Sequence, residues 1–365
     1  MKVIIAAAGT GGHINPGIAI ANEIKRHDMN ADITFIGTPR GLENDLVPRA
    51  GYKLRTIEAY GIVRKISFTN FRNACKTLKS YKTAKSIIKD IKPDIIIGTG
   101  GYICGPVLSS GIKLNIPTLL HESNAFPGVA VKLLSKKVDI VLVGFEDAKK
   151  RLPKAKNVVV TGTPTKLEKI NLTLEQKSNL KRELNINNNL PIVIVFGGSQ
   201  GAESINKCLT EIINKKLNKE YQIVWAVGKK NYEEVKTKIK EANNATILPY
   251  IYNMGEVLNL ADLVVSRSGA MTITEIAKCG KPAIFIPYPY ATENHQEYNA
   301  KVLSNANAAK IILDKELTSA NLNSAVNEAI KDKTKLNEMG INAQKITIKN
   351  VEEKIYNEIE KLIKN

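Results

Sequence analysis

The chain has 365 residues, enough for two domains of ordinary size, and 43% of them are hydrophobic, which is enough to fill two cores. It contains no run of about 18 or more apolar residues and enters a strand-like run close to its first Met, so we expect neither a membrane-spanning helix nor a signal peptide, and a protein that stays in the cytosol. The formal net charge of +18 indicates a polyanionic partner or surface, either nucleic acid or anionic lipid.

The N-terminal half alternates strand-like apolar runs with helical stretches, which is typical of βαβ units. Its first run, 3–8, leads into Gly9-Thr10-Gly11-Gly12-His13, and the run 95–97 leads into Gly98-Thr99-Gly100-Gly101-Tyr102. Glycine turns at the carboxyl ends of parallel strands bring backbone N–H groups and a helix start to an anion, so we predict anion-binding turns here. The strands predicted in this half are 3–8, 33–36, 95–97, 118–120, 140–143 and 158–160.

The segment 64–92 carries nine basic residues against the single acid Asp90, interleaved with aliphatic and aromatic residues. Such a mixture is typical of a membrane-surface segment, because cations meet acidic headgroups while apolar groups enter the interface. It equally fits a solvated, lysine-rich helix whose apolar side chains face the core, and both interpretations stay open. The basic residues are Arg64, Lys65, Arg72, Lys76, Lys79, Lys82, Lys85, Lys89 and Lys92.

A polar, asparagine-rich tract over 164–191 predicts a domain linker, after which a second βα series begins. The run 192–196 leads into Gly197-Gly198-Ser199-Gln200-Gly201, and the run 263–266 leads into a turn and a helix predicted over 270–278. We therefore predict a second doubly wound sheet. Its strands are 192–196, 223–227, 246–248, 263–266, 283–286 and 310–313, and Val351, Ile355, Ile359 and Leu362 predict a final amphipathic helix.

Spacing excludes the familiar phosphate-binding classes. Ile14 stands where the last glycine of a G-x-G-x-x-G dinucleotide motif belongs, and Gly280-Lys281 is followed by Pro282 rather than by the Ser or Thr of a P-loop. The sequence also has no Asp-x-Asp pair for a sugar-nucleotide metal. What remains is a diphosphate bound by helix starts and backbone donors without a dedicated metal site.

Polar side chains near the predicted strand ends suit a nucleotide sugar. Glu275 shares a helix face with Thr272 and has the acceptors for both hydroxyls of a ribose, although it also fits an ordinary helix acid. Gln296 and Asn299 are three residues apart, so their amides point one way, as sugar hydroxyls require. The strand 118–120 leads into His121-Glu122-Ser123-Asn124, and three of the four histidines, His13, His121 and His295, fall in such motifs.

In this order, the motifs resemble the bacterial undecaprenyldiphospho-muramoylpentapeptide β-N-acetylglucosaminyltransferases over nearly the whole chain. The glycine turns, His121-Glu122-Ser123-Asn124, the segment from Ser266 to Glu275 and Asn294-His295-Gln296 carry the resemblance. It implies an α/β fold of the GT-B type, with two doubly wound Rossmann-like domains facing a deep cleft and the C-terminal helix packing back on the N-terminal domain. The implied domains are 1–163 for the acceptor and membrane side, 164–342 for the UDP-sugar, and 343–365 for the C-terminal helix.

The resemblance implies inverting transfer of N-acetylglucosamine from UDP-N-acetylglucosamine to the 4-hydroxyl of the N-acetylmuramoyl-pentapeptide carried on undecaprenyl diphosphate. This reaction would serve peptidoglycan synthesis, and with it cell shape and division, on the cytoplasmic face of the cell membrane. The implied enzyme needs no cofactor or metal, binds an anionic membrane through residues 64–92 and binds no nucleic acid. Another GT-B transferase with a lipid acceptor and a UDP-N-acetylglucosamine 2-epimerase stay as alternatives. A basic nucleic-acid-binding protein is the alternative of another class, which the lack of a readout motif disfavours.

The resemblance also implies roles for individual residues. His13 or Glu122 would be the general base, with His13 slightly favoured because its ordinary pKa suits proton transfer near neutral pH. The family often has Gln at Ser123, and Asn and Arg at Thr163 and Lys166; Lys166 lacks the two-pronged guanidinium that grips phosphate. Gly100, Gly101 and Tyr102 would bind the acceptor diphosphate, and the donor would contact Thr10, Gly11, Gly12, Asn124, Lys166, Ser199, Ile251, Ala270, Met271, Thr272, Glu275 and Gln296.

Overall fold

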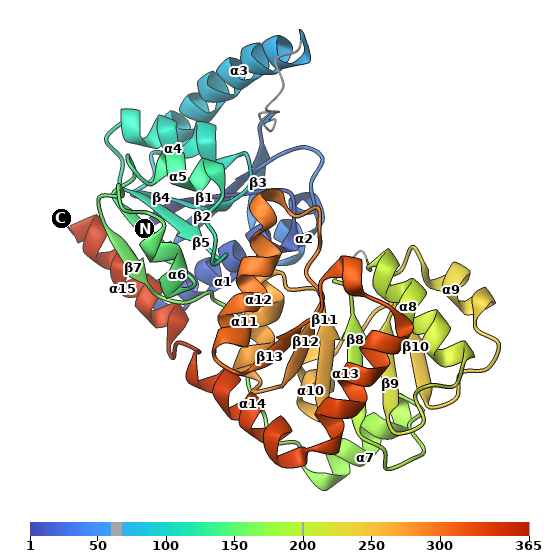
Figure 1. The fold of residues 1–365 in the computed structure, drawn as a ribbon. Helices are drawn as coiled ribbons and strands as arrows, with labels where there is room; N and C mark the ends of the chain where they lie inside the picture. Colours follow the sequence, from blue (N-terminus) through green and yellow to red (C-terminus); the bar gives the residue numbers. More distant parts are fainter. Residues whose placement is uncertain (60–67, 199–200, 365) are drawn as a thin grey trace. The chain divides into compact units, whose positions relative to one another are not determined.

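The computed structural model describes residues 1–59, 68–198 and 201–364, with side chains in the helix after residue 67 described from residue 79 onward. The chain forms two compact units, whose elements are labelled in Figure 1. Unit 1 comprises residues 1–166 and 348–365, and unit 2 comprises residues 167–347. The boundaries expected from the sequence were after residues 163 and 342.

Unit 1 is built on a wholly parallel sheet with helices on both faces. In the described residues its strand order is β3 (Lys53–Thr56), β2 (Asp32–Gly37), β1 (Lys2–Ala7), β4 (Ile95–Gly100), β5 (Thr118–Glu122), β6 (Ile140–Val143) and β7 (Val158–Val160). The helices are α1 (Gly11–His27), α2 (Glu43–Arg49), α3 (Phe68–Ile91), α4 (Cys104–Lys113), α5 (Val129–Leu134), α6 (Glu146–Lys150) and α15 (Val351–Lys364).

Strand β1 shows why the first apolar run is continuous. Val3 and Ile5 belong to the core cluster that contains residues of α1 and α15, whereas Ile4 and Ala6 belong to the cluster formed with α3 and α4. A strand covered by helices on both faces needs an apolar side chain at every position. The fold class predicted from the sequence is therefore confirmed for this unit.

The C-terminal helix α15 packs in unit 1, as the resemblance implies. Its residues Val351, Ile355 and Ile359 are buried in the same core cluster as α1. At the far end of α1, Arg26 donates to Glu353 at 2.6 Å and the ring of His27 stacks on Tyr356 at 3.8 Å. The amphipathic stripe on this helix thus finds its partner in α1.

Unit 2 repeats the architecture with a parallel sheet of its own. In the described residues its order is β10 (Ala245–Leu248), β9 (Gln222–Ala226), β8 (Ile192–Phe196), β11 (Leu263–Ser266), β12 (Ala283–Phe285) and β13 (Ala309–Ile311). Its helices are α7 (Leu174–Glu183), α8 (Glu203–Asn214), α9 (Tyr232–Lys238), α10 (Met254–Leu260), α11 (Ala270–Lys278), α12 (His295–Asn305), α13 (Ser319–Lys331) and α14 (Lys333–Lys345), and the 3-10 turns are η1 (Thr292–Asn294) and η2 (Asp314–Glu316).

Two elements differ from the sequence analysis. Strand β3 was not predicted because it is a short edge strand in which three of four residues are exposed, so it carries no apolar run. The polar tract 164–191 is not only a linker, because it contains α7 of unit 2. Helix α7 begins with a capping box, in which Thr173 accepts from the Gln176 N–H at 3.1 Å and Gln176 accepts from the Thr173 N–H at 2.8 Å.

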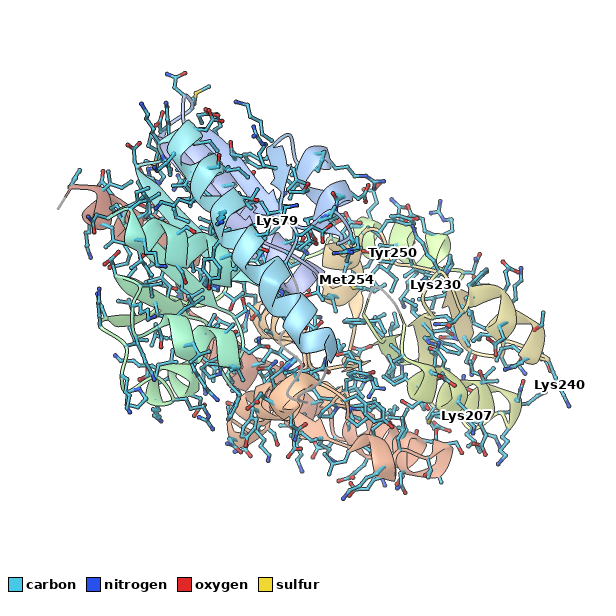
Figure 2. The ribbon with its side chains drawn as sticks, turned by 90° about the horizontal axis from the view of Figure 1, so that it is seen from above. Lys79, Lys207, Lys230, Lys240, Tyr250 and Met254 are labelled. Carbon is cyan, nitrogen blue, oxygen red and sulfur yellow. The ribbon has the colours of Figure 1, made fainter. Side chains whose placement is uncertain are left out.

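The described part of α3 has one buried and one exposed face. Ala84, Ile87 and Ile88 are buried in the unit 1 core, whereas Lys82 and Lys79 are exposed, the latter labelled in Figure 2. Residues 64–67 and the side chains of 68–78 lie outside the described residues. Elsewhere lysines project from α8 and from the segments flanking α9, so the positive charge is spread over both units (Figure 2). In the described parts of the chain no helix is both long and apolar enough to cross a membrane.

Candidate active site

Two glycine turns of unit 1 meet where the strand order reverses, between β1 and β4. In open parallel sheets, ligands bind outside the carboxyl ends of the strands at such a point. Gly101 has a φ of 86°, and a Cβ at this position would lie 2.5 Å from the carbonyl oxygen of Ala8. A Cβ on Gly100 would lie 2.3 Å from the ring of His13. Glycine is therefore required at both positions for the two turns to pack together.

His13 stands in this turn with its ring orientation fixed. Its Nδ1 lies 3.1 Å from the carbonyl oxygen of Ala8, and Thr99 Oγ1 donates to the His13 carbonyl oxygen at 2.8 Å. Because a carbonyl only accepts, Nδ1 carries the hydrogen and the lone pair of the neutral ring lies on Nε2. Within the described residues Nε2 makes no hydrogen bond, so this nitrogen is available to receive a proton.

Helix α1 begins directly after the turn. Thr10 is its N-cap residue, and Gly11 and Gly12 form the first positions of the helix. No side chain of the described residues caps this end. The first N–H groups and the positive end of the helix dipole therefore favour an anion here. Tyr102, in the neighbouring turn, is 66% exposed.

The carboxylate of Glu122 accepts hydrogen bonds from the loop that follows it. One carboxylate oxygen accepts from the backbone N–H and side-chain amide of Asn124 at 2.8 and 2.9 Å, and the other accepts from the Gly128 N–H at 3.2 Å. The preceding His121 is buried, donates from Nε2 to the Gly162 carbonyl oxygen at 3.0 Å, and has its pKa lowered to about 4 by burial. Glu122 thus positions Asn124, and His121 is a neutral structural residue.

Unit 2 also has its glycine turns where the strand order reverses, between β8 and β11. In the turn after β8, Gly198 and Gly201 have φ of 88° and 77°, and a Cβ on Gly201 would lie 2.2 Å from the Val227 carbonyl oxygen. This close approach to the end of β9 requires glycine. Ser199, which the resemblance implies as a donor contact, lies outside the described residues.

Helix α11 begins at the end of β11 as predicted and brings three candidate donor-binding residues together in its first turn. Gly269 is the N-cap, and no side chain of the described residues caps Ala270, Met271 and Thr272. At the other end, the Gly280 N–H donates to the Ala277 carbonyl and the Lys281 N–H to the Ile276 carbonyl, which forms a Schellman motif. Partly buried Glu275 lies one turn beyond Met271 and Thr272.

Of the two amides predicted to face a sugar, only Gln296 stays a candidate. Its Oε1 accepts from the Tyr288 N–H at 3.0 Å, which leaves the amide N–H groups to donate to a ligand. Asn299 is fully buried, and its amide donates to the Ser268 carbonyl oxygen at 3.1 Å, so the expectation that it faces a sugar was wrong. Asn299 instead joins α12 to the turn before α11.

Two other candidate donor-binding residues occupy coil segments. Ile251 is only 3% exposed, between exposed Tyr250 and Tyr252, so a base at this position would be recognised by backbone groups. Lys166 is exposed at the end of the first segment of unit 1, while Thr163 close by is buried.

Arg267 is a structural centre of unit 2 to which the sequence analysis gave no role. Its guanidinium donates to the Ile286 and Pro287 carbonyls at 3.0 and 3.1 Å, to Asp314 at 2.5 Å and to Ser204 Oγ at 2.8 Å. These bonds connect the turn after β11 with α8, the end of β12 and η2. A basic residue inside a glycine turn is the only local signal, and its partners are distant in the sequence.

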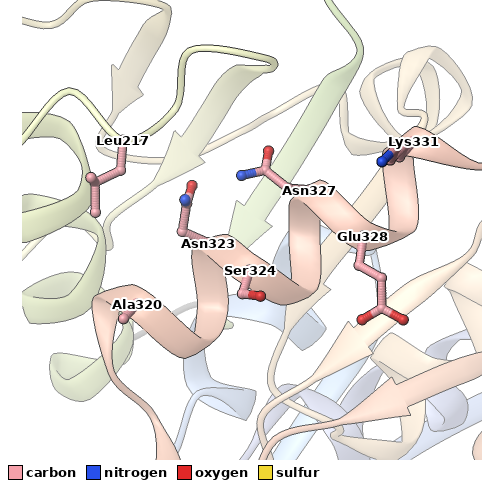
Figure 3. A pocket seen from close by; sticks show the side chains of 7 residues that line it. All are labelled: Leu217, Ala320, Asn323, Ser324, Asn327, Glu328 and Lys331. Carbon is pink, nitrogen blue, oxygen red and sulfur yellow. The ribbon is translucent and has the colours of Figure 1, made fainter.

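The described residues also contain an open depression of about 630 Å³ in unit 2 (Figure 3). It lies beside α13 and Leu217, and none of its lining residues belongs to the glycine turns. It is not the predicted donor site. Its lining residues are Leu217, Ala320, Asn323, Ser324, Asn327, Glu328 and Lys331.

One group of described residues has the donor atoms for a metal ion, and it too is remote from the turns. Glu23, His27 and Glu353 converge at the far end of α1, about 20 Å along the helix from His13. The guanidinium of Arg26 donates to both carboxylates at 2.6 Å, so a cation already occupies their acceptors.

Two Rossmann-like units, each with glycine turns and a helix start at its switch point, have the architecture of the GT-B glycosyltransferases. Residues 3–143 match the N-terminal domain and residues 192–355 the C-terminal domain of glycosyltransferase family 28, and the chain belongs to that family.

Curated relatives match along the whole chain. The UDP-N-acetylglucosamine--N-acetylmuramyl-(pentapeptide) pyrophosphoryl-undecaprenol N-acetylglucosamine transferase of Acetivibrio thermocellus is 44% identical, covering 100% of this chain and 99% of that protein. The protein of the same name from Caldanaerobacter subterraneus is 42% identical, covering 98% of each chain. Among solved structures, Acinetobacter baumannii MurG superposes with a TM-score of 0.78 at 28% identity, covering 99% of each chain. The resemblance inferred from the motifs is confirmed.

Proposed function

We propose that this enzyme transfers N-acetylglucosamine from UDP-N-acetylglucosamine to the 4-hydroxyl of the N-acetylmuramoyl-pentapeptide on undecaprenyl diphosphate, with inversion. The observation that carries the proposal is the 44% identity, over the full length, to a transferase of that name. The products are UDP and the lipid-linked disaccharide.

In the proposed reaction, His13 is the general base. The acceptor oxygen forms a bond to the anomeric carbon, the bond from that carbon to the UDP oxygen breaks, and the hydroxyl proton passes to His13 Nε2. The fixed Nδ1–H bond to Ala8 supports this role, because it leaves the Nε2 lone pair available. The three N–H bonds to Glu122 favour His13 over that carboxylate.

The proposed donor site lies mainly in unit 2. The uncapped start of α11 would stabilise the diphosphate charge, with Glu275 on the ribose hydroxyls and Gln296 on the sugar. We propose that no metal is needed. Turnover should then survive complete chelation of divalent cations, and a loss that added Mg²⁺ or Mn²⁺ restores would contradict it.

We further propose that the enzyme works at the cytoplasmic face of the membrane as a peripheral protein, with the basic face of α3 toward anionic lipid. Lys79 and Lys82 are exposed in the described part of this helix. Binding to acidic vesicles should weaken with added salt and on neutralising Lys76, Lys79 and Lys82. Equal binding to neutral vesicles would contradict the proposal.

The proposed reaction is tested by UDP release. UDP should form from UDP-N-acetylglucosamine only when the lipid-linked muramoyl-pentapeptide is added. UDP formation or epimerisation without an acceptor would favour an epimerase, and equal turnover with unrelated lipid acceptors would favour another GT-B transferase.

A further inference from the structure

A buried carboxylate stands behind the first glycine turn of unit 1. Glu43, the first residue of α2, is 0% exposed. Its Oε2 accepts from the Gly9 N–H at 2.9 Å, and its Oε1 accepts from the Thr38 N–H and hydroxyl at 2.8 and 2.7 Å. Burial alone would raise the pKa of Glu43, but these hydrogen bonds outweigh it and lower the pKa, so the buried group is a carboxylate.

Two glycines before α2 lie against this side chain. A Cβ on Gly41 would lie 1.9 Å from Glu43 Oε2, and a Cβ on Gly37 would lie 2.6 Å from Glu43 Cγ. Two positions that lack a side chain thus surround the carboxylate, which therefore has little freedom to leave the Gly9 N–H.

One peptide group connects Glu43 with His13. The N–H of the Ala8–Gly9 peptide donates to Glu43, and the carbonyl of the same peptide accepts from His13 Nδ1. A negative charge on the N–H side polarises the peptide, which makes its carbonyl oxygen a stronger acceptor. A stronger acceptor at Nδ1–H stabilises the protonated ring and holds its orientation.

We propose that Glu43 is a positioning residue for the transfer, which acts through the Ala8–Gly9 peptide to orient His13 and to increase the affinity of Nε2 for a proton. This inference rests on the proposed role of His13 as general base. The other ionisable groups of this region interact elsewhere or face solvent. Arg40 pairs with Glu58, the Cys104 thiol contacts backbone atoms of Gly100 and Ala6, and Tyr102 is exposed.

The test is Glu43→Gln, which keeps the shape and removes the charge. The four histidines allow the His13 ring to be assigned and titrated by NMR with labelled histidine. We expect turnover to fall about tenfold and the acid limb of the pH profile to move to lower pH, together with the NMR titration of the ring. The KM for UDP-N-acetylglucosamine should change by less than about twofold.

A matched control comes from the opposite edge of the same sheet. Asp139 accepts from the N–H and the hydroxyl of Thr118, both at 2.8 Å, just as Glu43 does from Thr38. Asp139→Asn should lower stability without moving the His13 titration. An equal shift in this variant would overturn the proposal, as would an unchanged His13 pKa in Glu43→Gln.

If Glu43→Gln does not fold, Gly41→Ala tests the proposal instead. Its added methyl displaces the carboxylate without removing the charge, and should shift the His13 pKa in the same direction; no shift overturns the proposal. The titration needs no substrate. Full activity of His13→Ala would refute the proposed base, while the NMR shift still reports whether Glu43 acts on His13.

Discussion

Each unit places a glycine turn between a strand and a helix start, but different side chains hold the turn in the two units. In unit 1 the turn is enclosed by a carboxylate and an imidazole, because Glu43 and His13 bond opposite sides of one peptide group. In unit 2 the turn after β11 is held by Arg267, whose guanidinium donates to two backbone carbonyls, Asp314 and Ser204. The comparison teaches that one turn carries a group able to move a proton, whereas the other presents a helix start suited to bind charge.

Removing the proposed general base is the strongest test of this difference. His13→Ala should lower turnover by about 100-fold or more and leave UDP binding largely intact, because the loss falls on the chemical step. UDP release measures the first effect and calorimetry the second. Glu122→Gln is the companion variant, and a larger loss there than in His13→Ala would transfer the role of base to Glu122.

Removing the side chain that holds the unit 2 turn should lower the free energy of unfolding. Arg267 and Asp314 are 10% and 20% exposed, so Arg267→Ala leaves a largely buried carboxylate and several carbonyls without their donor. We expect the free energy of unfolding to fall by about 2 kcal/mol, measured by denaturant titration. Arg182→Ala, on the exposed face of α7, should change it by less than about 0.5 kcal/mol. Equal effects would show that Arg267 does not hold the turn.

We expect the α11 side chains to bind the donor substrate and to take no part in the chemical step. Glu275→Gln should raise the KM for UDP-N-acetylglucosamine about tenfold with a smaller change in kcat, because the proposed ribose contact would be present throughout the reaction. Glu234→Gln on exposed α9 is the control and should match the parent enzyme. A fall in kcat alone would place Glu275 in the chemical step instead.

His121 should make the stability of the protein depend on pH. Burial lowers the pKa of His121 from 6.5 to about 4, so between these values the unfolded chain binds a proton that the folded chain does not. Stability is then lost as the pH falls, by about 1 kcal/mol between pH 6.5 and 5.5 from this residue. In denaturant titrations at both pH values, His121→Gln should lose less than the parent by that amount. Parallel pH dependence of the two proteins would contradict the assignment.

Local patterns in the chain were enough to predict the two series of parallel strands, the glycine turns that end them and the family. Strands at 140–143, 158–160, 192–196 and 263–266 and the helix at 270–278 have the predicted bounds, because apolar runs and glycine stops are local signals. The edge strand β3 and helix α7 lack such runs and were not predicted.

The environment of each strand-end side chain depends on the folded protein. His13 and His121, or Gln296 and Asn299, look equivalent along the chain, but burial and hydrogen bonds give them different roles. Glu43 shows the physical reason most directly. Its carboxylate bonds a backbone N–H 34 residues away, and such a bond depends on how the topology brings α2 to the end of β1, which no local pattern in the sequence contains.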